Sequence, residues 1–291
     1  RGPMEFPADV EMEMDDSHLP KSSSSAMPDL QAATVPRLKA KVHRLTPERL
    51  KQISLSDLCY RPLQASDMDE MIALHQEWFP VSYDQDFYNK SVTGNLHSIV
   101  AVLPPNGGSH VAPALPSGQT AEENILGMIT ISTYCEHHKE AIAHILGADC
   151  DMACRSRDAE EGGTGALAYI LTLGIAEGFW RRGLARELIR RSVEQVESDL
   201  PEVQAVFLHV VTYNTAAIQL YESCRFLKIE YFPRFYFLHG KHYDSFLYAH
   251  YLHGHRPPWK WRVKNLASVW GQWMLSYWTA LWQPSCEGRS T

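Results

Sequence analysis

The stretch of sequence that decides the fold is ALAYILTLGIAEGFWRRGLARELIRRSVEQVESDLPEVQAVFLHVVTYNTAAIQLYESCRF, residues 166–226. Its first part, residues 166–175, is almost entirely apolar, which predicts a strand covered on both faces. Apolar residues then recur at helical spacing over 184–196, and residues 206–211 predict a second strand. Because a helix joins the two strands, we expect them to be parallel neighbours in a right-handed crossover.

The turn between the first strand and the helix reads Arg181-Arg182-Gly183-Leu184-Ala185. A glycine turn that opens a helix leaves backbone N–H groups pointing outward, which makes a seat for a diphosphate. The two arginines add positive charge beside those amides. We therefore expect a nucleotide-like cofactor at this turn. The alternative is a solvated arginine pair at the start of a helix.

The segments before and after this stretch predict further strands and helices in a mostly antiparallel arrangement. A strand at 59–63 precedes a helix whose N-cap is predicted at Ser66. Strands at 98–102 and 126–131 flank a Pro/Gly/Ser-rich insertion, which predicts a hairpin with a long loop. The remaining expectations are a helix over 84–93, a polar loop over 136–165, a helix from Asn214, and a closing hairpin formed by 226–232 and 243–252.

Composition and charge narrow the class of protein. The chain has 291 residues, 45% of them hydrophobic, which is enough for a buried core in one globular domain spanning residues 55–252. The net charge is −7 and no Lys/Arg cluster dominates the middle of the chain, so we expect no nucleic-acid partner. Residues 1–54 contain few aromatic residues and pass from acidic to serine-rich to basic, so we expect them to be disordered.

The cysteines show no regular spacing, and the N-terminus lacks the apolar core of a signal peptide. We therefore expect reduced thiols in the cytosol. Cys150 and Cys154 stand near His137, His138 and His144, but this spacing fits no standard zinc pattern. We expect no metal and interpret both cysteines as free thiols, with a zinc site as the alternative.

The segment 257–283 is rich in tryptophan and basic residues. Six of the eight tryptophans lie between Trp259 and Trp282, and no acidic residue occurs among them. Apolar residues recur at helical spacing, but polar residues interrupt them, which favours a helix lying in the headgroup region over one that spans the bilayer. We expect this tail to bind an anionic membrane surface. The alternative is packing on the protein's own core or a homodimer contact.

The order of these features resembles the GNAT family of acetyltransferases over residues 55–252. That fold is α/β (α+β), with a mixed, mostly antiparallel sheet, a splayed parallel strand pair and flanking helices. Several segments resemble more closely the NatF-type N-alpha-acetyltransferases of animal Golgi membranes, and the first is shared with the NatE type. These segments are Trp78-Phe79-Pro80-Val81-Ser82-Tyr83, residues 168–174, residues 208–210, residues 214–218 with Tyr221-Glu222, and Gly254-His255-Arg256-Pro257-Pro258-Trp259.

The resemblance implies acetyl-CoA as co-substrate and assigns a role to each matching residue. Tyr169 and His209 would be the catalytic pair, and Tyr83, Leu171 and Tyr236 would contact the first residues of a peptide. The pantetheine arm would be bound by Leu173, Gly174 and Ile175, the diphosphate by Arg181, Arg182, Gly183, Leu184, Ala185 and Arg186, and the rest of the CoA path would be lined by Asn214, Tyr221 and Glu222.

An independent chemical argument supports the catalytic pair. An α-amino group has a pKa of about 8, so a histidine can accept its proton directly or through a water. A phenol titrates near 10, so Tyr169 would relay a proton through a bound water. Without the resemblance, Tyr169 as a core aromatic residue and His209 as a buried imidazole are equally consistent with the sequence.

Two positions depart from the family pattern. Trp180 stands where the diphosphate motif has Arg or Gln, so the side-chain contact made by that residue is absent unless Arg181 or Arg182 substitutes for it. Ser82 stands where the Golgi enzymes are expected to have an acidic residue, which affects the preference for the peptide's first side chain.

The function implied is N-alpha-acetylation of proteins at the cytosolic face of the Golgi membrane. The substrates would be transmembrane proteins with cytosolic N-termini that retain Met, of Met-Lys, Met-Leu or Met-Ile type. Direct attack is favoured, because no cysteine lies beside Tyr169 or His209 in the motif strands. One alternative is a lysine (histone) acetyltransferase, which would need a stronger base because a lysine amine titrates near 10.4. Another is a membrane-tethered binding module without turnover.

Overall fold

The computed structural model describes residues 45–79, 81, 83–104, 123–133, 139–147, 167–238 and 240–263. The helices are α1 (Pro47–Gln52), α2 (Met68–Trp78), α3 (Gln85–Thr93), α4 (Lys139–Leu146), α5 (Leu184–Asp199) and α6 (Thr215–Ser223). The strands are β1 (Cys59–Arg61), β2 (His97–Leu103), β3 (Asn124–Ser132), β4 (Leu167–Ile175), β5 (Ala205–Val211), β6 (Leu227–Leu238) and β7 (Lys241–Tyr251). Short 3-10 turns lie at Leu55–Asp57, Ala65–Asp67 and Glu177–Phe179.

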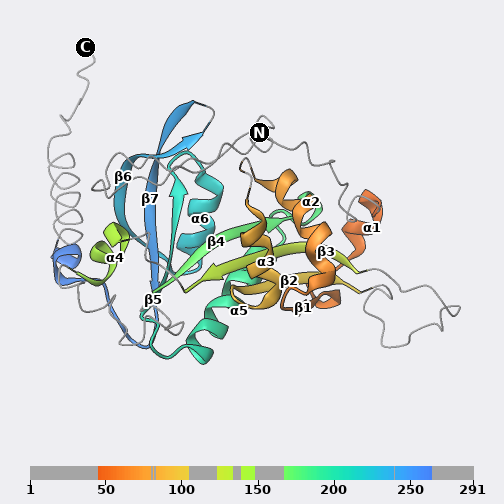
Figure 1. The fold of residues 1–291 in the computed structure, drawn as a ribbon, viewed down its shortest axis with the longest axis horizontal. Coiled ribbons are helices and arrows are strands. Elements are labelled where there is room, and N and C mark those ends of the chain that lie inside the picture. Colours follow the sequence, from red (N-terminus) through yellow and green to blue (C-terminus); the bar gives the residue numbers. More distant parts are fainter. Residues whose placement is uncertain are drawn as a thin grey trace, which may run out of the picture.

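The described strands form one seven-stranded sheet in the order β1-β2-β3-β4-β5-β7-β6 (Figure 1). The β4–β5 pair is parallel, and the other five neighbouring pairs are antiparallel. The parallel pair is the one joined by α5, as a right-handed crossover requires. The predicted mixed, mostly antiparallel sheet with one parallel pair is confirmed.

The parallel ladder between β4 and β5 is short. It contains three pairs and ends at Tyr169↔Phe207. Beyond that point β4 stays paired with β3 as far as Gly127↔Ile175, and β5 stays paired with β7 as far as Val211↔Ser245. The facing edges of β4 and β5 therefore diverge, and their backbone groups open into a wedge, as the resemblance implies.

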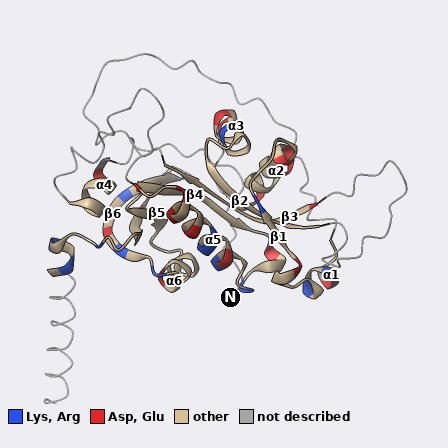
Figure 2. Ribbon diagram, turned by 90° about the horizontal axis from the view of Figure 1, so that it is seen from below, with Lys and Arg blue, Asp and Glu red and all other residues tan. Residues whose placement is uncertain are grey.

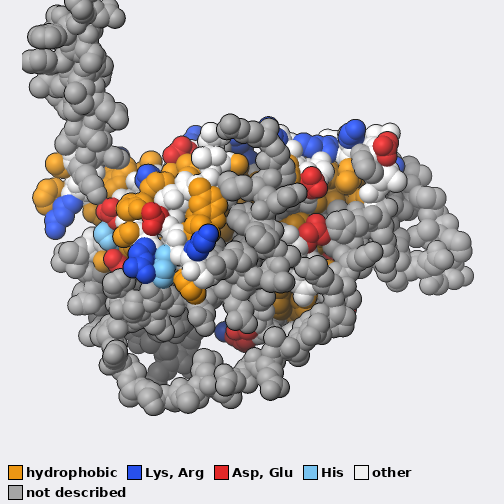
Figure 3. Space-filling view, turned by 90° about the horizontal axis from the view of Figure 1, so that it is seen from above, with side chains coloured by type: hydrophobic (Ala, Val, Ile, Leu, Met, Phe, Trp, Pro, Cys, Tyr) orange, Lys and Arg blue, Asp and Glu red, His pale blue; other side chains and the backbone are white. Residues whose placement is uncertain are grey.

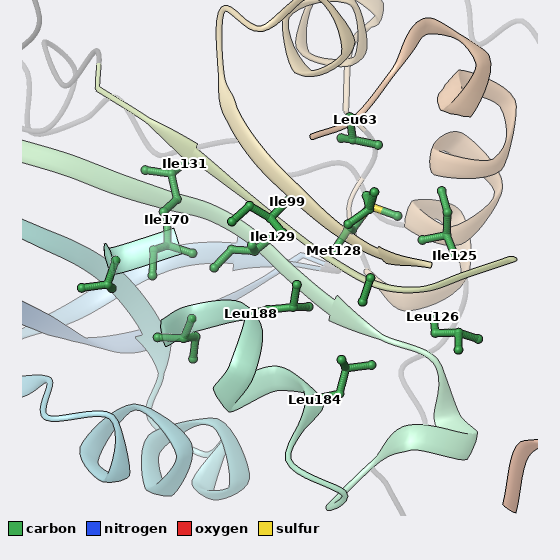
Figure 4. Packing of buried hydrophobic residues seen from close by; sticks show 14 of the residues in the cluster. Leu63, Ile99, Ile125, Leu126, Met128, Ile129, Ile131, Ile170, Leu184 and Leu188 are labelled. Carbon is green, nitrogen blue, oxygen red and sulfur yellow. The ribbon is translucent and has the colours of Figure 1, made fainter. Parts of the chain in front are cut away.

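Helices cover both faces of the sheet, with α2 and α3 on one face and α5 and α6 on the other (Figure 2). Leu184 and Leu188 of α5 belong to the same buried cluster as the strand residues Ile129 and Ile170, and Leu188 lies on the side of Ile129 (Figure 4). Burying a leucine side chain contributes about 1.5–3 kcal/mol. This packing fixes the start of α5 relative to β4, and with it the turn that joins them.

The N-terminal boundary of the domain differs from the prediction. Composition predicts disorder as far as residue 54, but the described part begins at residue 45 and contains α1. The side chain of Thr46 caps this helix by accepting a hydrogen bond from the backbone N–H of Arg49 at 3.2 Å. Ile53 is buried in the core. The segment folds because it contributes apolar side chains to the domain.

Two other local predictions are wrong. Ser66 is not the N-cap of α2, because it lies inside a 3-10 turn in which the carboxylate of Asp67 accepts from the backbone N–H of Gln64 at 2.8 Å. The polar loop expected over 136–165 contains α4. That helix forms because Ile142 and its apolar neighbours pack against β5 and β6 in a second buried cluster.

The described chain ends in a short helical segment at residues 259–263. The indole Nε1 of Trp261 donates to the carbonyl of Lys228 at 2.9 Å, which attaches this segment to β6. Among the described helices, none is long and apolar enough to cross a membrane. The predictions for residues 1–44, for the rest of the tail, for the insertion at 104–119 beyond its first residue and for the Cys150/Cys154 pair lie outside the described residues.

Candidate active site

Tyr169 and His209 lie together at the point where β4 and β5 part. Tyr169 belongs to the last pair of the parallel ladder, and His209 lies two residues beyond its partner Phe207. Alternate residues of a strand share a face, so both side chains lie on the same side of the sheet. Their ring centroids are 5.8 Å apart in an edge-on arrangement. The structure thus brings together the two residues that the resemblance assigns to catalysis.

Aromatic rings surround the His209 imidazole. Phe235 stacks on it, with the ring centroids 4.1 Å apart, and Phe232 and Phe207 approach it edge-on. His209 is 9% exposed. Sequence reasoning missed Phe235, although the aromatic run at 232–237 was a visible signal. These rings fix the plane in which the imidazole nitrogens lie.

A group of phenols converges beside this pair. The hydroxyl of Tyr236 on β6 donates to the backbone carbonyl of His209 at 3.1 Å. Burial, together with the neighbouring Tyr169, Tyr221 and Tyr83, raises the pKa of Tyr236 well above its ordinary value. Tyr236 therefore stays protonated at neutral pH and acts as a hydrogen-bond donor. Two of the three predicted peptide-contacting residues, Tyr83 and Tyr236, thus lie near each other, and Tyr236 also lies near Tyr169.

The segment between α2 and α3 holds Tyr83 in place through aromatic packing. Tyr83 stacks on Phe87 with ring centroids 4.5 Å apart, and burial raises its pKa. The neighbouring His75 of α2 is completely buried, and burial lowers its pKa to about 3. His75 is therefore neutral. In the sequence, only its place in the helical spacing of apolar residues indicates that it is buried. Ser82 lies outside the described residues.

Leu171, the third predicted peptide contact, lies in a β-bulge. Thr172 pairs with Thr130 and Ile170 pairs with Ile131, so Leu171 is the extra residue in β4. Bulges bend a strand and re-aim its side chains, and they often occur next to active sites. The bulge lies just beyond Tyr169, where β4 begins to diverge from β5.

Leu173, Gly174 and Ile175 occupy the diverging end of β4. Their partners in the ladder, Ile129, Met128 and Gly127, are all on β3. The edge of β4 that would face β5 therefore carries backbone groups outside any described ladder. This placement suits the predicted contact with a pantetheine arm, whose amides need such backbone partners.

The turn before α5 has the backbone expected of an anion site. Gly183, the N-cap of α5, has φ 92°, and a residue with a Cβ rarely adopts this conformation. The first amides of α5 have no acceptor within the helix, and its dipole favours negative charge there. Leu184 is buried and contributes only its backbone, and Ala185 follows it in the first helical turn.

The arginines of this turn differ in the hydrogen-bond partners of their side chains. Arg181 is exposed, and within the described residues no hydrogen bond or ion pair holds its guanidinium. Arg186 is also exposed and donates to the hydroxyl of Ser223 at 3.1 Å. Trp180, which is 43% exposed, donates from its indole Nε1 to the carbonyl of Ile175 at 2.9 Å. Arg181 is therefore the exposed cation of this turn, and its contact with the diphosphate stays a prediction.

The side chain of Arg182 has partners within the protein. Its Nη1 donates to the carbonyl of Leu50 at 2.7 Å and to that of Gly178 at 3.1 Å, and its contact with the diphosphate stays a prediction. Its Nη2 donates to the carbonyl of Ile53. A guanidinium engaged in this way points toward the N-terminal segment, so its role is to connect two parts of the chain.

Helix α6 begins and ends with side chains that have structural partners. Asn214 caps the helix by accepting from the backbone N–H of Ala217 at 3.2 Å. Glu222 accepts from the hydroxyl of Tyr248 at 2.9 Å. Tyr221 is buried, and its phenol lies near that of Tyr236. The contacts of Asn214, Tyr221 and Glu222 with CoA stay predictions.

Comparison with known proteins identifies the class. Residues 68–226, more than half of the chain, match the acetyltransferase (GNAT) family. The chain therefore belongs to the GNAT acetyltransferase family, in agreement with its fold and with the wedge between β4 and β5.

Individual relatives give a finer description. The chain is 29% identical over 209 residues to N-alpha-acetyltransferase 60 of Danio rerio, covering 71% of this chain and 74% of the relative. It is 28% identical over 200 residues to Histone acetyltransferase MCC1 of Arabidopsis thaliana, covering 68% and 72%. The crystal structure of Arabidopsis thaliana NAA60 in complex with acetyl-CoA matches with a TM-score of 0.50 and 29% identity, covering 68% of this chain and 99% of that one.

Proposed function

We propose that this chain is an N-alpha-acetyltransferase that transfers acetyl from acetyl-CoA to the α-amine of a protein N-terminus. The observation that carries the proposal is the Tyr169–His209 pair, whose ring centroids lie 5.8 Å apart where β4 and β5 part. The similarity to animal N-alpha-acetyltransferase 60 and to NAA60 with bound acetyl-CoA supports it. The site residues fit the donor, because a turn with outward amides and an exposed arginine lies at the end of β4.

In the reaction, acetyl-CoA supplies a thioester, and the amine nitrogen bonds to its carbonyl carbon while the carbon–sulfur bond breaks. The amine loses one proton and the departing sulfur gains one. His209 is placed to take the amine's proton directly or through a water, and Tyr169 to relay a proton through a hydrogen-bonded water. Tyr236 fixes the backbone at His209, and Phe235 fixes its ring. The edge of β4 and the start of α5 hold the donor.

The acid–base chemistry of a histidine favours an α-amine over a lysine amine as the substrate. An α-amine loses its proton at about pH 8, whereas a lysine side chain does so at about 10.4. The rings in contact with His209 are those of Tyr169, Phe207, Phe232 and Phe235. A histidine side chain can accept the proton of an α-amine more readily than that of a lysine amine.

Lysine acetylation is the second candidate, favoured by the similarity to Histone acetyltransferase MCC1. A direct comparison tests the two: a peptide with a free N-terminal Met and no lysine, and an N-blocked peptide that contains lysine. We expect the first to be acetylated with a much higher kcat/KM. Higher turnover of the blocked peptide would overturn the proposal, and binding of acetyl-CoA without turnover of either would favour a binding module.

The proposal extends to the location of the enzyme. We propose that it acts at the cytosolic face of the Golgi membrane on transmembrane proteins whose N-termini start with Met-Lys, Met-Leu or Met-Ile, and that the tail from residue 257 binds the membrane. In support, Trp259 and Val263 are 69% and 54% exposed at the start of the tail. Apolar and basic side chains lie side by side at the left edge of the surface in Figure 3.

Vesicle co-sedimentation tests the membrane contact. The full chain should sediment with vesicles that contain anionic lipid and should remain in solution with neutral vesicles at moderate salt. Replacing both Trp259 and Val263 with serine should weaken this binding and leave peptide acetylation in solution unchanged. Unaltered sedimentation of the double variant would contradict a role for these two side chains.

A further inference from the structure

The N-terminal segment packs directly on the turn that precedes α5. A Cβ added to Gly178 would lie 2.8 Å from Cδ1 of Leu50, and one added to Gly183 would lie 3.6 Å from Cδ1 of Leu55. Leu50 and Leu55 also pack against the main core cluster, of which Ile53 is a buried member. Residues 50–55 therefore form one wall of the turn, although they lie outside the part of the chain that matches the family.

Arg182 connects residues 50–55 to the turn before α5 through hydrogen bonds. Its guanidinium donates to the carbonyls of Leu50, Ile53 and Gly178, and its Cζ lies 4.4 Å from the centroid of the Phe179 ring. A planar guanidinium can reach several carbonyls at once from one position, which an ammonium cannot do. One side chain thus joins α1, the residue after it and the 3-10 turn.

The backbone around Arg182 needs such support. Arg181 has φ 60° and Gly183 has φ 92°, so residues on both sides of Arg182 lie in the left-handed region. A residue with a side chain is unfavourable there and persists only when its surroundings determine the conformation. This turn is therefore held in its conformation by contacts outside itself.

We propose that Arg182 is a positioning residue for the acetyl donor, and that the segment 47–57 controls the affinity for acetyl-CoA through it. The inference rests on the proposed use of this turn as the diphosphate seat. It differs from direct recognition, in which the positive charge of Arg182 would itself contact the diphosphate. It also differs from a general role in stability, which would affect every ligand alike.

The test uses the full chain and two donors, acetyl-CoA and acetyl-pantetheine, of which only the first has a diphosphate. In Arg182→Lys the charge remains, but the three carbonyls cannot all be reached. We expect the Kd for acetyl-CoA, measured by calorimetry, to rise about tenfold, as for the loss of charge-assisted hydrogen bonds. The Kd for acetyl-pantetheine should stay unchanged, and the effect on acetylation should be in KM for acetyl-CoA and not in kcat.

A matched control and a second variant separate the explanations. Arg190→Lys makes the same chemical change on α5, where Arg190 pairs with Glu187 and Glu194 on the surface, and should bind both donors as the parent does. Gly178→Ala leaves Arg182 intact and displaces Leu50 from the turn, so it should weaken acetyl-CoA binding selectively as well.

Three results would overturn the inference: undiminished binding of acetyl-CoA by Arg182→Lys, equal weakening of both donors, or full affinity in Gly178→Ala. Calorimetric binding does not depend on which amine is acetylated. Failure of this inference is therefore distinguishable from failure of the proposed N-alpha-acetylation.

Discussion

The indole ring of Trp78 lies directly against the backbone of Gly174. A Cβ built on Gly174 would lie 2.1 Å from Cε3 and 2.8 Å from Cζ3 of Trp78. Only glycine allows the end of α2 to approach β4 this closely. The chain continues from Trp78 toward Tyr83, while Gly174 belongs to the diverging end of β4. This contact therefore sets the spacing between the peptide side and the donor side of the site.

Replacing Gly174 with alanine should disturb both sides at once. The new methyl group meets a rigid ring, so α2 must move away from β4. We expect a loss of about 1–3 kcal/mol in the free energy of unfolding, as for other overpacked sites, together with higher KM values for donor and peptide. Urea unfolding and steady-state kinetics measure the two effects.

Gly127→Ala is the matched control for that substitution. Its new Cβ would meet Cδ1 of Ile175 at 2.8 Å and Cδ1 of Leu188 at 3.1 Å, the ends of flexible side chains, and the backbone oxygen of Gly174 at 3.3 Å. Because the two closest atoms can move, we expect a smaller loss of stability and smaller changes in KM than in Gly174→Ala. If Gly127→Ala proves the more damaging of the two, the Trp78–Gly174 contact does not set the spacing.

Tyr169→Phe tests the phenol of the candidate pair without removing its ring. Packing against Phe207, with ring centroids 4.8 Å apart, is retained, so the melting temperature should change little. Loss of proton relay should lower kcat by about 10²–10⁴-fold. The control is Tyr243→Phe, since Tyr243 contacts Tyr213 and not the pair. A Tyr169→Phe enzyme with normal kcat would contradict the assignment.

Phe235→Leu tests the stacking on His209. Leucine fills much of the volume but lacks the flat face that lies against the imidazole. We expect kcat to fall while KM for acetyl-CoA remains near its original value, because the donor turn is untouched. His209→Ala should lower kcat further, and adding Phe235→Leu to it should then cost little more. Additive losses would show that Phe235 acts independently of His209.

His75 should make stability dependent on pH. Its pKa is about 3 in the folded protein and near 6.5 when unfolded, so the unfolded state binds the additional proton between these values. The free energy of unfolding should therefore fall as pH decreases from 6.5 toward 3, by up to about 1.4 kcal/mol per pH unit from this residue.

Urea unfolding at several pH values measures this slope. In His75→Phe the slope below pH 6.5 should decrease. An identical slope in His75→Phe would mean that His75 does not stay neutral in the folded protein.

The sequence was sufficient to predict the arrangement that brings Tyr169 and His209 together, whereas their catalytic roles came from the resemblance to a known family. The parallel strands, the turn before α5 and the approach of Tyr169 to His209 depend on local patterns: an apolar run, helical spacing and a glycine turn. Such signals are contained in neighbouring residues, and the crossover rule converts them into an arrangement in space.

The features that sequence reasoning missed depend on distant contacts. Helix α4 is short and flanked by polar residues, so its apolar spacing is too brief to predict a helix. The helix forms because its apolar side chains pack against the sheet. Phe235 reaches His209 because the β6–β7 register shifts between Phe232 and Tyr236. Arg182 lies in a motif that suggests an anion, yet its acceptors Leu50 and Ile53 are more than a hundred residues earlier in the chain.

The short ladder of three pairs between β4 and β5 also makes the thermal stability of the protein depend on a bound ligand. It is the only seam of hydrogen-bonded strands that joins the two halves of the described sheet, so a molecule lodged in the wedge bridges both halves. Donor that binds the folded chain alone stabilises it by RT ln(1 + [L]/Kd). The melting temperature of this protein should therefore rise with the concentration of free acetyl donor.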